Sequence, residues 1–233
     1  GKAAMNVSTT ASYNVAVGTN SGAALTTGDL NNVFVGHSSG TAVTTGNNNV
    51  MIGSHAGDNF DTEASNVGIG TDALGGAIAG GEQNVAVGRL SLAGVTSGDD
   101  NVAVGHNAGN SITTGGFNTL VGRSAGEDMV DQRLTAVGYY AGANTTGNQN
   151  NFFGFNCGSG NTSGQDNIAM GYNALYQPDT EDHNLAIGNA AMGGAIAGGE
   201  FNVAIGNNAL DALTSGDNHT AIGYQAGSAL TTT

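Results

Sequence analysis

The side chains best suited to bind a ligand recur at one position of this sequence, directly after a set of regularly spaced glycines. Six of them follow one another in successive repeats: Arg89, His106, Arg123, Tyr139, Phe155 and Tyr172. Cationic groups bind carboxylates through charge-assisted hydrogen bonds, and the faces of aromatic rings suit sugar rings. We therefore treat this column as a candidate strip for an acidic or neutral glycan. The alternative is structural, with the arginines paired to Glu82, Asp99, Glu127 or Asp128.

Paired carboxylates are the other residues that could do chemistry. Asp99–Asp100 and Glu127–Asp128 could flank a glycosidic bond. The sequence contains no nucleophile elbow, zinc-binding helix motif or phosphate-binding loop, so we expect no enzyme. Calcium is an alternative ligand, although the nonapeptide calcium motif is missing, and we expect no other cofactor. Aspartates recur near the turn after a T-T-G or T-S-G motif, at Asp29, Asp99, Asp166 and Asp217.

The composition excludes several classes of protein. The 233 residues include 41 glycines, 18 acidic residues and only 4 lysines and arginines, for a net charge of −14. A chain so acidic repels the phosphate backbone, so we expect no nucleic-acid partner. No apolar run approaches the roughly 20 residues that span a bilayer, so we expect no membrane insertion. The single cysteine, Cys157, is expected to be a small core residue.

An internal repeat organises the whole chain. A five-residue word, N-V-A-V-G or N-V-A-I-G in its commonest form, occurs thirteen times at spacings of 16 to 18 residues. Residues 49–109 also match residues 167–227 at an offset of 118, which indicates duplication of a block of repeats. The words end at Gly18, Gly36, Gly53, Gly70, Gly88, Gly105, Gly122, Gly138, Gly154, Gly171, Gly188, Gly206 and Gly223.

The repeat length predicts an all-β parallel solenoid. Some seventeen residues are too few for a helical hairpin, and interior glycines oppose helix at about 1 kcal/mol each. They suit one coil with two short strands and two turns, in which each coil contacts mainly its neighbours. We expect about 13 coils of 16–18 residues. A lead-in segment would cover residues 1–13 and a single solenoid domain residues 14–233.

The word itself is expected to form a strand whose alternate side chains point to opposite faces. Its fourth position is apolar in every repeat, so we assign it to the interior of the coil. This column contains Val17, Val35, Ile52, Ile69, Val87, Val104, Val121, Val137, Phe153, Met170, Ile187, Ile205 and Ile222.

The third position is never polar either, although it must face the other way. A strand that is apolar on both faces is normally buried on both, and one thin coil covers only one of them. We therefore predict an oligomer with the third position at its interface: Ala16, Phe34, Met51, Ala86, Ala103, Leu120, Ala136, Phe152, Ala169, Ala186, Ala204 and Ala221.

The asparagine that opens most words has a structural explanation. Stacked asparagines can form a hydrogen-bonded ladder along a solenoid, and asparagine tolerates left-handed backbone at a turn. The repeat glycines similarly allow positive φ or a close backbone approach at corners.

These words, followed by two variable residues and Ala or Ser, resemble the head repeats of trimeric autotransporter adhesins of the YadA type. They resemble even more closely the repeats of bacteriophage tail-fibre proteins, as in NHTAIGYQAG at residues 218–227. The resemblance covers residues 14–233. It implies a left-handed β-roll assembled as a parallel homotrimer, an extracellular place on a virion tail fibre or bacterial cell surface, and attachment to a host-surface glycan or outer-membrane receptor. The ends lack polar capping repeats, so we expect a fragment of a longer fibre.

The function expected from these features is a structural or receptor-binding segment of a trimeric surface fibre of the phage tail-fibre type. One alternative is a bacterial trimeric adhesin head. Another is an ice- or mineral-binding solenoid, for which a flat, regular threonine column would be expected. Thr26, Thr44, Thr113 and Thr145 give only an interrupted column, because Ala79 and Ala197 break the pattern.

Overall fold

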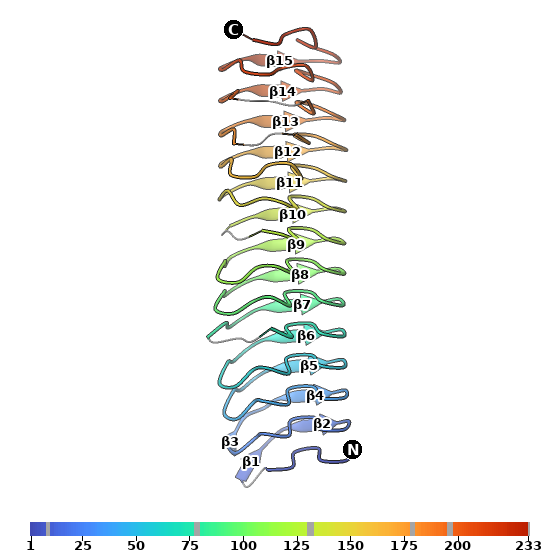
Figure 1. Cartoon of the computed structure of the whole chain (residues 1–233), viewed down its shortest axis with the longest axis vertical. Coiled ribbons are helices and arrows are strands. Elements are labelled where there is room, and N and C mark those ends of the chain that lie inside the picture. Colours follow the sequence, from blue (N-terminus) through green and yellow to red (C-terminus); the bar gives the residue numbers. More distant parts are fainter. Residues whose placement is uncertain (8–9, 77–79, 130–132, 178–179, 195–197, 233) are drawn as a thin grey trace. The chain divides into compact units, whose positions relative to one another are not determined.

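A computed structural model of the chain describes residues 1–7, 10–76, 80–129, 133–177, 180–194 and 198–232. The chain forms two compact units, Gly1–Asn118 and Thr119–Thr233. Each unit is a stack of parallel β-coils, and together they have about twelve turns, with no helix among the described residues (Figure 1). The prediction of an all-β parallel solenoid is confirmed.

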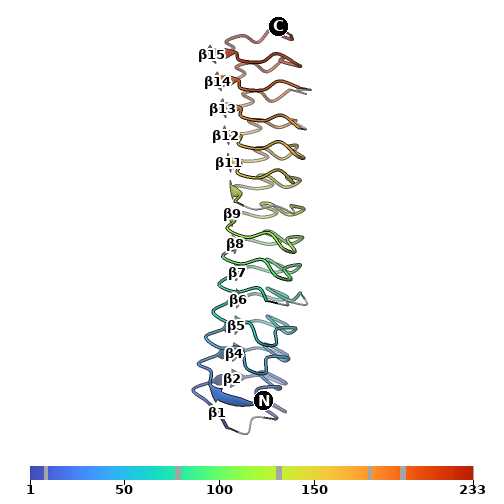
Figure 2. The same cartoon turned by 90° about the vertical axis from the view of Figure 1, so that its left-hand side faces the viewer.

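Most coils contribute one strand of three residues, and the strands of neighbouring coils pair in parallel. In the first unit the strands are β1 (Thr10–Ser12), β2 (Val15–Val17), β3 (Thr27–Asp29), β4 (Val33–Val35), β5 (Val50–Ile52), β6 (Val67–Ile69), β7 (Val85–Val87) and β8 (Val102–Val104). In the second unit they are β9 (Thr119–Val121), β10 (Thr135–Val137), β11 (Asn151–Phe153), β12 (Ile168–Met170), β13 (Leu185–Ile187), β14 (Val203–Ile205) and β15 (Thr220–Ile222). The register places equal repeat positions opposite one another, as with Val33, Val50 and Val67. Figure 2 shows the strands stacked along one side of each unit.

The expectation of two strands per coil was wrong for most coils. Among the described residues only β1 and β3 form a second small sheet, and β1 lies within the segment predicted as a lead-in. Elsewhere the rest of the coil consists of turns, because residues such as Ser38 and Gly40 have φ of 55° and 57° and interrupt extended backbone. The ladder still continues there, since Gly40 N–H donates to the carbonyl of Ala56 in the next coil, at 3.0 Å.

The two faces of the strand are reversed relative to the prediction. The third position points into the coil, and the fourth position, predicted to fill the interior, is partly exposed: 56% for Val17 and 37% for both Ile52 and Val104. The predicted interface column is therefore the core of the single chain. Ala16, in the first strand, is of intermediate burial. The buried members are Phe34, Met51, Ala86, Ala103, Leu120, Ala136, Phe152, Ala169, Ala186, Ala204 and Ala221.

A second column explains why the third position varies so widely in size. The residue six positions later also lies in the core, and in most coils a large residue at one of the two positions accompanies a small one at the other. Phe34 is followed by Gly40, whose added Cβ would stand 2.5 Å from the phenyl ring. Gly68 is instead followed by Leu74, which is fully buried with φ of 52°. A small third residue such as Gly68 thus makes room for a core side chain of its own coil and not for a partner chain.

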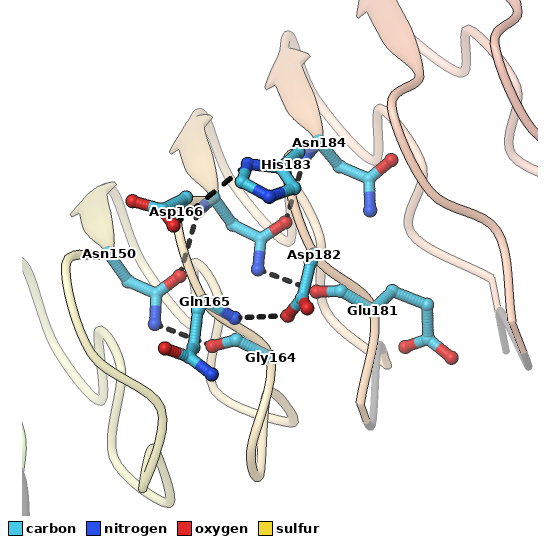
Figure 3. A network of polar contacts seen from close by, with 9 residues as sticks. Asn150, Gly164, Gln165, Asp166, Glu181, Asp182, His183 and Asn184 are labelled. Carbon is cyan, nitrogen blue, oxygen red and sulfur yellow. Dashed lines mark hydrogen bonds and ion pairs between the residues drawn. The ribbon is translucent and has the colours of Figure 1, made fainter.

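The asparagine column forms the predicted ladder inside the coil. The side-chain carbonyl of Asn167 accepts the backbone N–H of Asn184 at 2.9 Å, and its amide donates to the carbonyl of Glu181 at 2.7 Å (Figure 3). The same pair of bonds recurs around Asn49 in the first unit. Each amide thus bonds backbone groups of the next coil that would otherwise be buried without a partner, which costs about 1–3 kcal/mol per group.

The repeat glycines are required by both conformation and space. Gly53 has φ of 142°, and a Cβ there would stand 2.3 Å from the carbonyl oxygen of Gly70 in the next coil. No side chain fits such a contact, so any other residue would separate neighbouring coils at this corner.

Cys157 replaces the small residue that other coils place three positions after the repeat glycine. Its side chain is fully buried, as expected for a core residue. Burial raises the pKa of this thiol from 9.0 to about 12, because the thiolate loses its hydration. Cys157 is thus a packing residue held in the neutral form.

This shift predicts a pH dependence of stability. The unfolded chain releases the thiol proton near pH 9.0, whereas the folded chain retains it to about 12. The contribution of Cys157 is therefore fully present below pH 9 and decreases above it by about 1.4 kcal/mol per pH unit. Denaturant unfolding of wild type and Cys157→Ala at pH 8, 10 and 11 measures it. Parallel pH profiles for the two proteins would contradict the assignment.

Size compensation in the core predicts a favourable coupling between Phe34 and Gly40. Phe34→Ala alone leaves a cavity and should destabilise the chain by about 3–5 kcal/mol. Adding Gly40→Leu rebuilds the arrangement of Ala86 and Leu92 and should recover part of that loss. Gly40→Leu alone should be strongly destabilising, since it collides with the Phe34 ring. A double-mutant cycle by denaturant unfolding measures the coupling, and additive losses would refute the pairing.

Candidate functional site

The outward face of the strands carries an uncharged, largely apolar surface, here called the apolar strip. It consists of the second and fourth residues of every word. In the first unit all twelve are valine or isoleucine: Val15, Val17, Val33, Val35, Val50, Ile52, Val67, Ile69, Val85, Val87, Val102 and Val104. In the second unit they are Thr119, Val121, Thr135, Val137, Asn151, Phe153, Ile168, Met170, Leu185, Ile187, Val203, Ile205, Thr220 and Ile222.

Two further columns flank the strip on the same face. The entry column is the residue just before the first residue of each word, and the exit column is the residue just after the repeat glycine. In the coil of β13 these are His183 and Asn189, both exposed. The alternation of exposed and buried residues from one column to the other places both of them, with the strip between, on the outer face.

The exit column of the second unit forms a continuous stack. The Arg123 guanidinium lies over the Tyr139 ring, 5.5 Å from its centroid. Tyr139 stacks on Phe155 at 4.8 Å, and Phe155 stacks on Tyr172 at 5.4 Å, with interplanar angles of 17°. Tyr140 also packs edge-on against Tyr139. The predicted stacking of rings in successive coils is therefore confirmed for these residues.

The exit column of the first unit contains the two remaining predicted site residues. A guanidinium nitrogen of Arg89 lies 3.2 Å from Nε2 of His106 in the next coil. The carboxylate partners expected for Arg89 and Arg123 are not found: among the described residues neither guanidinium forms an ion pair. These cations are thus held by an imidazole and an aromatic ring instead.

The stack limits how the proposed strip could bind a sugar. One face of Tyr139 is covered by Arg123 and the other by Phe155, and both faces of Phe155 are covered in turn. A sugar ring could therefore stack only beyond Tyr172, while the edges and hydroxyls of the other rings remain accessible. This arrangement favours a structural role for the column over a row of sugar subsites.

The entry column contains a second cluster, which sequence analysis missed. The His183 ring stacks on Phe201 with centroids 4.7 Å apart. Its Nδ1 lies 3.9 Å from a carboxylate oxygen of Asp166 (Figure 3). These residues belong to three successive coils and share one repeat position. Comparing the residues that precede each word would have found them, because His183 and Phe201 occupy the positions of Ser65 and Gln83 in the earlier block of repeats.

The backbone of the entry column is left-handed throughout. Arg133, His183 and Phe201 have φ of 64°, 60° and 57°. Asparagine adopts this conformation readily and occupies the same position at Asn31 and Asn48, whereas bulky side chains are uncommon there. The conformation costs such residues about 1–3 kcal/mol, which the stacked coils must compensate.

Several of the carboxylates considered for chemistry have backbone partners. Asp99 accepts the N–H of Glu82 at 2.8 Å, and Asp217 accepts the N–H of Glu200 at 2.9 Å. Each links one turn to the next coil. Within the described part of the chain, no group of three or more His, Cys, Asp or Glu side chains is arranged to hold a metal ion. The side chain of Asp29 lies outside the description.

The threonine column is engaged in a similar ladder. The hydroxyls of Thr26 and Thr96 donate to the carbonyls of Thr44 and Thr113 in the next coil, at 3.2 and 3.0 Å. Ala79 and Ala197, which interrupt the column in the sequence, lie outside the described residues.

No helix in the described ranges is long and apolar enough to cross a membrane.

The aromatic stack yields a testable prediction. Replacing Arg123 and Tyr139 together by Ser removes one cation–π contact and one ring stack, so stability should fall by about 1–2 kcal/mol. If the column also docks a glycan, attachment to the host surface should fall with it. Tyr224→Ser, in the same column but outside the stack, is the matched control. Full attachment by a folded Arg123→Ser/Tyr139→Ser variant would leave only the structural role.

Comparison with known proteins identifies no relative. No protein family, curated protein or solved structure matches the chain. The functional argument therefore rests on the surfaces of the chain itself.

Proposed function

We propose that this chain is a rod-forming segment of a trimeric surface fibre, of the kind that attaches a phage or a bacterium to a host cell. The observation that carries the proposal is the apolar strip. Its exposed members include Val17, Ile52, Val104, Ile168 and Met170, and apolar side chains exposed side by side in successive coils mark an interaction surface. The strand is apolar on both faces, and the single chain covers only the inner one.

A second copy of the same chain is the partner that fits the strip. Its side chains repeat from coil to coil at the strand spacing of about 4.8 Å. A partner must present side chains at the same spacing to interdigitate along several coils. Another copy in the same orientation does so for the full height of each unit, because its strip is identical.

The distribution of charge supports the same partner. The chain carries 18 acidic residues, yet the strip has no charged side chain. The entry and exit columns contain Arg89, Arg123 and Arg133 together with only two aspartates, Asp100 and Asp166. Copies that meet through this face therefore keep most of their negative charge apart and in water.

The number of copies and the hand of the coil come from the resemblance to phage tail-fibre and adhesin-head repeats. On that resemblance we assign three parallel chains, a left-handed coil and an extracellular location on a virion fibre or a bacterial cell surface. A bacterial adhesin head is the alternative within the same architecture. The attachment target is then a host-surface glycan or an outer-membrane receptor.

Ice binding is the alternative from another functional class. It requires a flat, regular array of threonine hydroxyls free to order water. Here Thr26, Thr96, Thr146 and Thr214 donate their hydroxyls to the next coil. A thermal-hysteresis measurement separates the two functions, and we expect no hysteresis.

A charge on the strip tests the proposal. In the single chain the Val104 side chain is 37% exposed, so Val104→Lys keeps its ammonium in water and leaves the fold intact. In the assembly the same charge is buried without a partner, which costs several kcal/mol. Light scattering should give three times 22.9 kDa for the wild type and a smaller mass for the variant. Ser97→Lys, at an exposed turn, should assemble as the wild type does. A wild-type chain that is monomeric would refute the proposal.

A further inference from the structure

The entry and exit columns stand at opposite ends of the same strand. In every coil their residues are six positions apart, as are Ser65 and Thr71 in the first unit and Arg133 and Tyr139 in the second. Between them lies the three-residue strand, which at about 3.3 Å per residue separates the two columns by roughly 10 Å. The two side chains of one coil are therefore held apart within one chain, although they share the outer face with the apolar strip.

A symmetry axis parallel to the stacking direction brings the two columns of different copies together. Rotation about such an axis moves no coil along it, so equivalent coils of all copies stand at one level. All strands at that level run in the same sense around the axis. The end of one copy's strand thus points to the beginning of its neighbour's strand.

We propose that the corners of the assembly are built from in-register pairs, in which the exit residue of one copy contacts the entry residue of the same coil in the next copy. This inference rests on the proposed self-association through the apolar strip, and it adds which residues of adjacent copies meet. The partner is a second copy of this chain, joined by a heterologous contact repeated around the ring.

The chemistry of the pairs is complementary. Arg133 faces Tyr139, and Asp166 faces Tyr172. An arginine can donate to a phenol oxygen, and a carboxylate can accept from a phenol. No coil brings two charges of the same sign together.

The ring stack agrees with this arrangement. Because Arg123 and Phe155 cover both faces of Tyr139, its hydroxyl and edge are what it can offer to a neighbour. Within the described residues of its own chain, Arg133 forms no ion pair. A corner contact to a neighbouring Tyr139 provides a hydrogen-bond acceptor for this guanidinium, namely the phenol oxygen.

Disulfide trapping tests the pairing. In a Cys157→Ala background, Ser65→Cys with Thr71→Cys places two exposed thiols six residues apart on each chain. Under mild oxidation these should link adjacent copies into a species of the full oligomer mass on a denaturing, non-reducing gel. The control pair, Asn31→Cys with Thr71→Cys, differs by two coils, roughly 10 Å, which exceeds the 4.4–6.8 Å between Cα atoms that a disulfide normally spans. We expect at least tenfold less linkage from the control.

The outcomes separate this inference from the proposed function. Light scattering on the same reduced samples reports whether the copies assemble at all. An assembled protein in which the in-register pair links no better than the control overturns the corner pairing and leaves self-association standing. A protein that stays monomeric overturns both.

Discussion

Every other feature of this molecule depends on the hydrogen bonds that join each coil to the next. Backbone donors and acceptors meet equivalent groups one repeat away, and the asparagine amides bond the groups that the strands leave over. Because Gly53 and its equivalents lie in contact with the next coil, no side chain can separate the turns there. Residues at the same repeat position in successive coils therefore lie next to one another and form a column. The chemistry of the surface depends on these columns and not on isolated residues.

This constraint explains why the chain presents so regular a surface. The coil encloses only the third residue of each strand, with its leucine or small neighbour, and it leaves the second and fourth residues outside. Coils this thin bury little apolar area per residue, so an uncovered valine face is both a cost in water and a source of association free energy. The acidic residues lie almost entirely away from that face. The inner face of each strand thus stabilises the single coil, and the outer face of the same strand favours association with another copy.

The architecture could be predicted from the sequence, but the assignment of the inner and outer faces of the strand was wrong. Periodic words and glycine density were enough for a parallel solenoid, because few other folds repeat every 16 to 18 residues. Which face of the strand points into the coil was harder to predict. Here valines lie outside and alanines inside, whereas larger apolar residues are usually expected to fill the core. The informative signal was the inverse relation in size between Phe34 and Gly40, and between Gly68 and Leu74. The second residue of each pair lies outside the strand, so a prediction based on the strand alone does not consider it. The aromatic stack followed from the spacing of the coils, whereas the His183 cluster required attention to residues outside the word.

The central claim is that the apolar strip is the surface through which copies of the chain meet. Electron cryomicroscopy of the intact chain in solution tests it most directly. The account predicts particles with several copies around a common axis, with Val85 and Val87 of each copy buried against the others. Single-chain particles, or an assembly in which those valines face water, would contradict it.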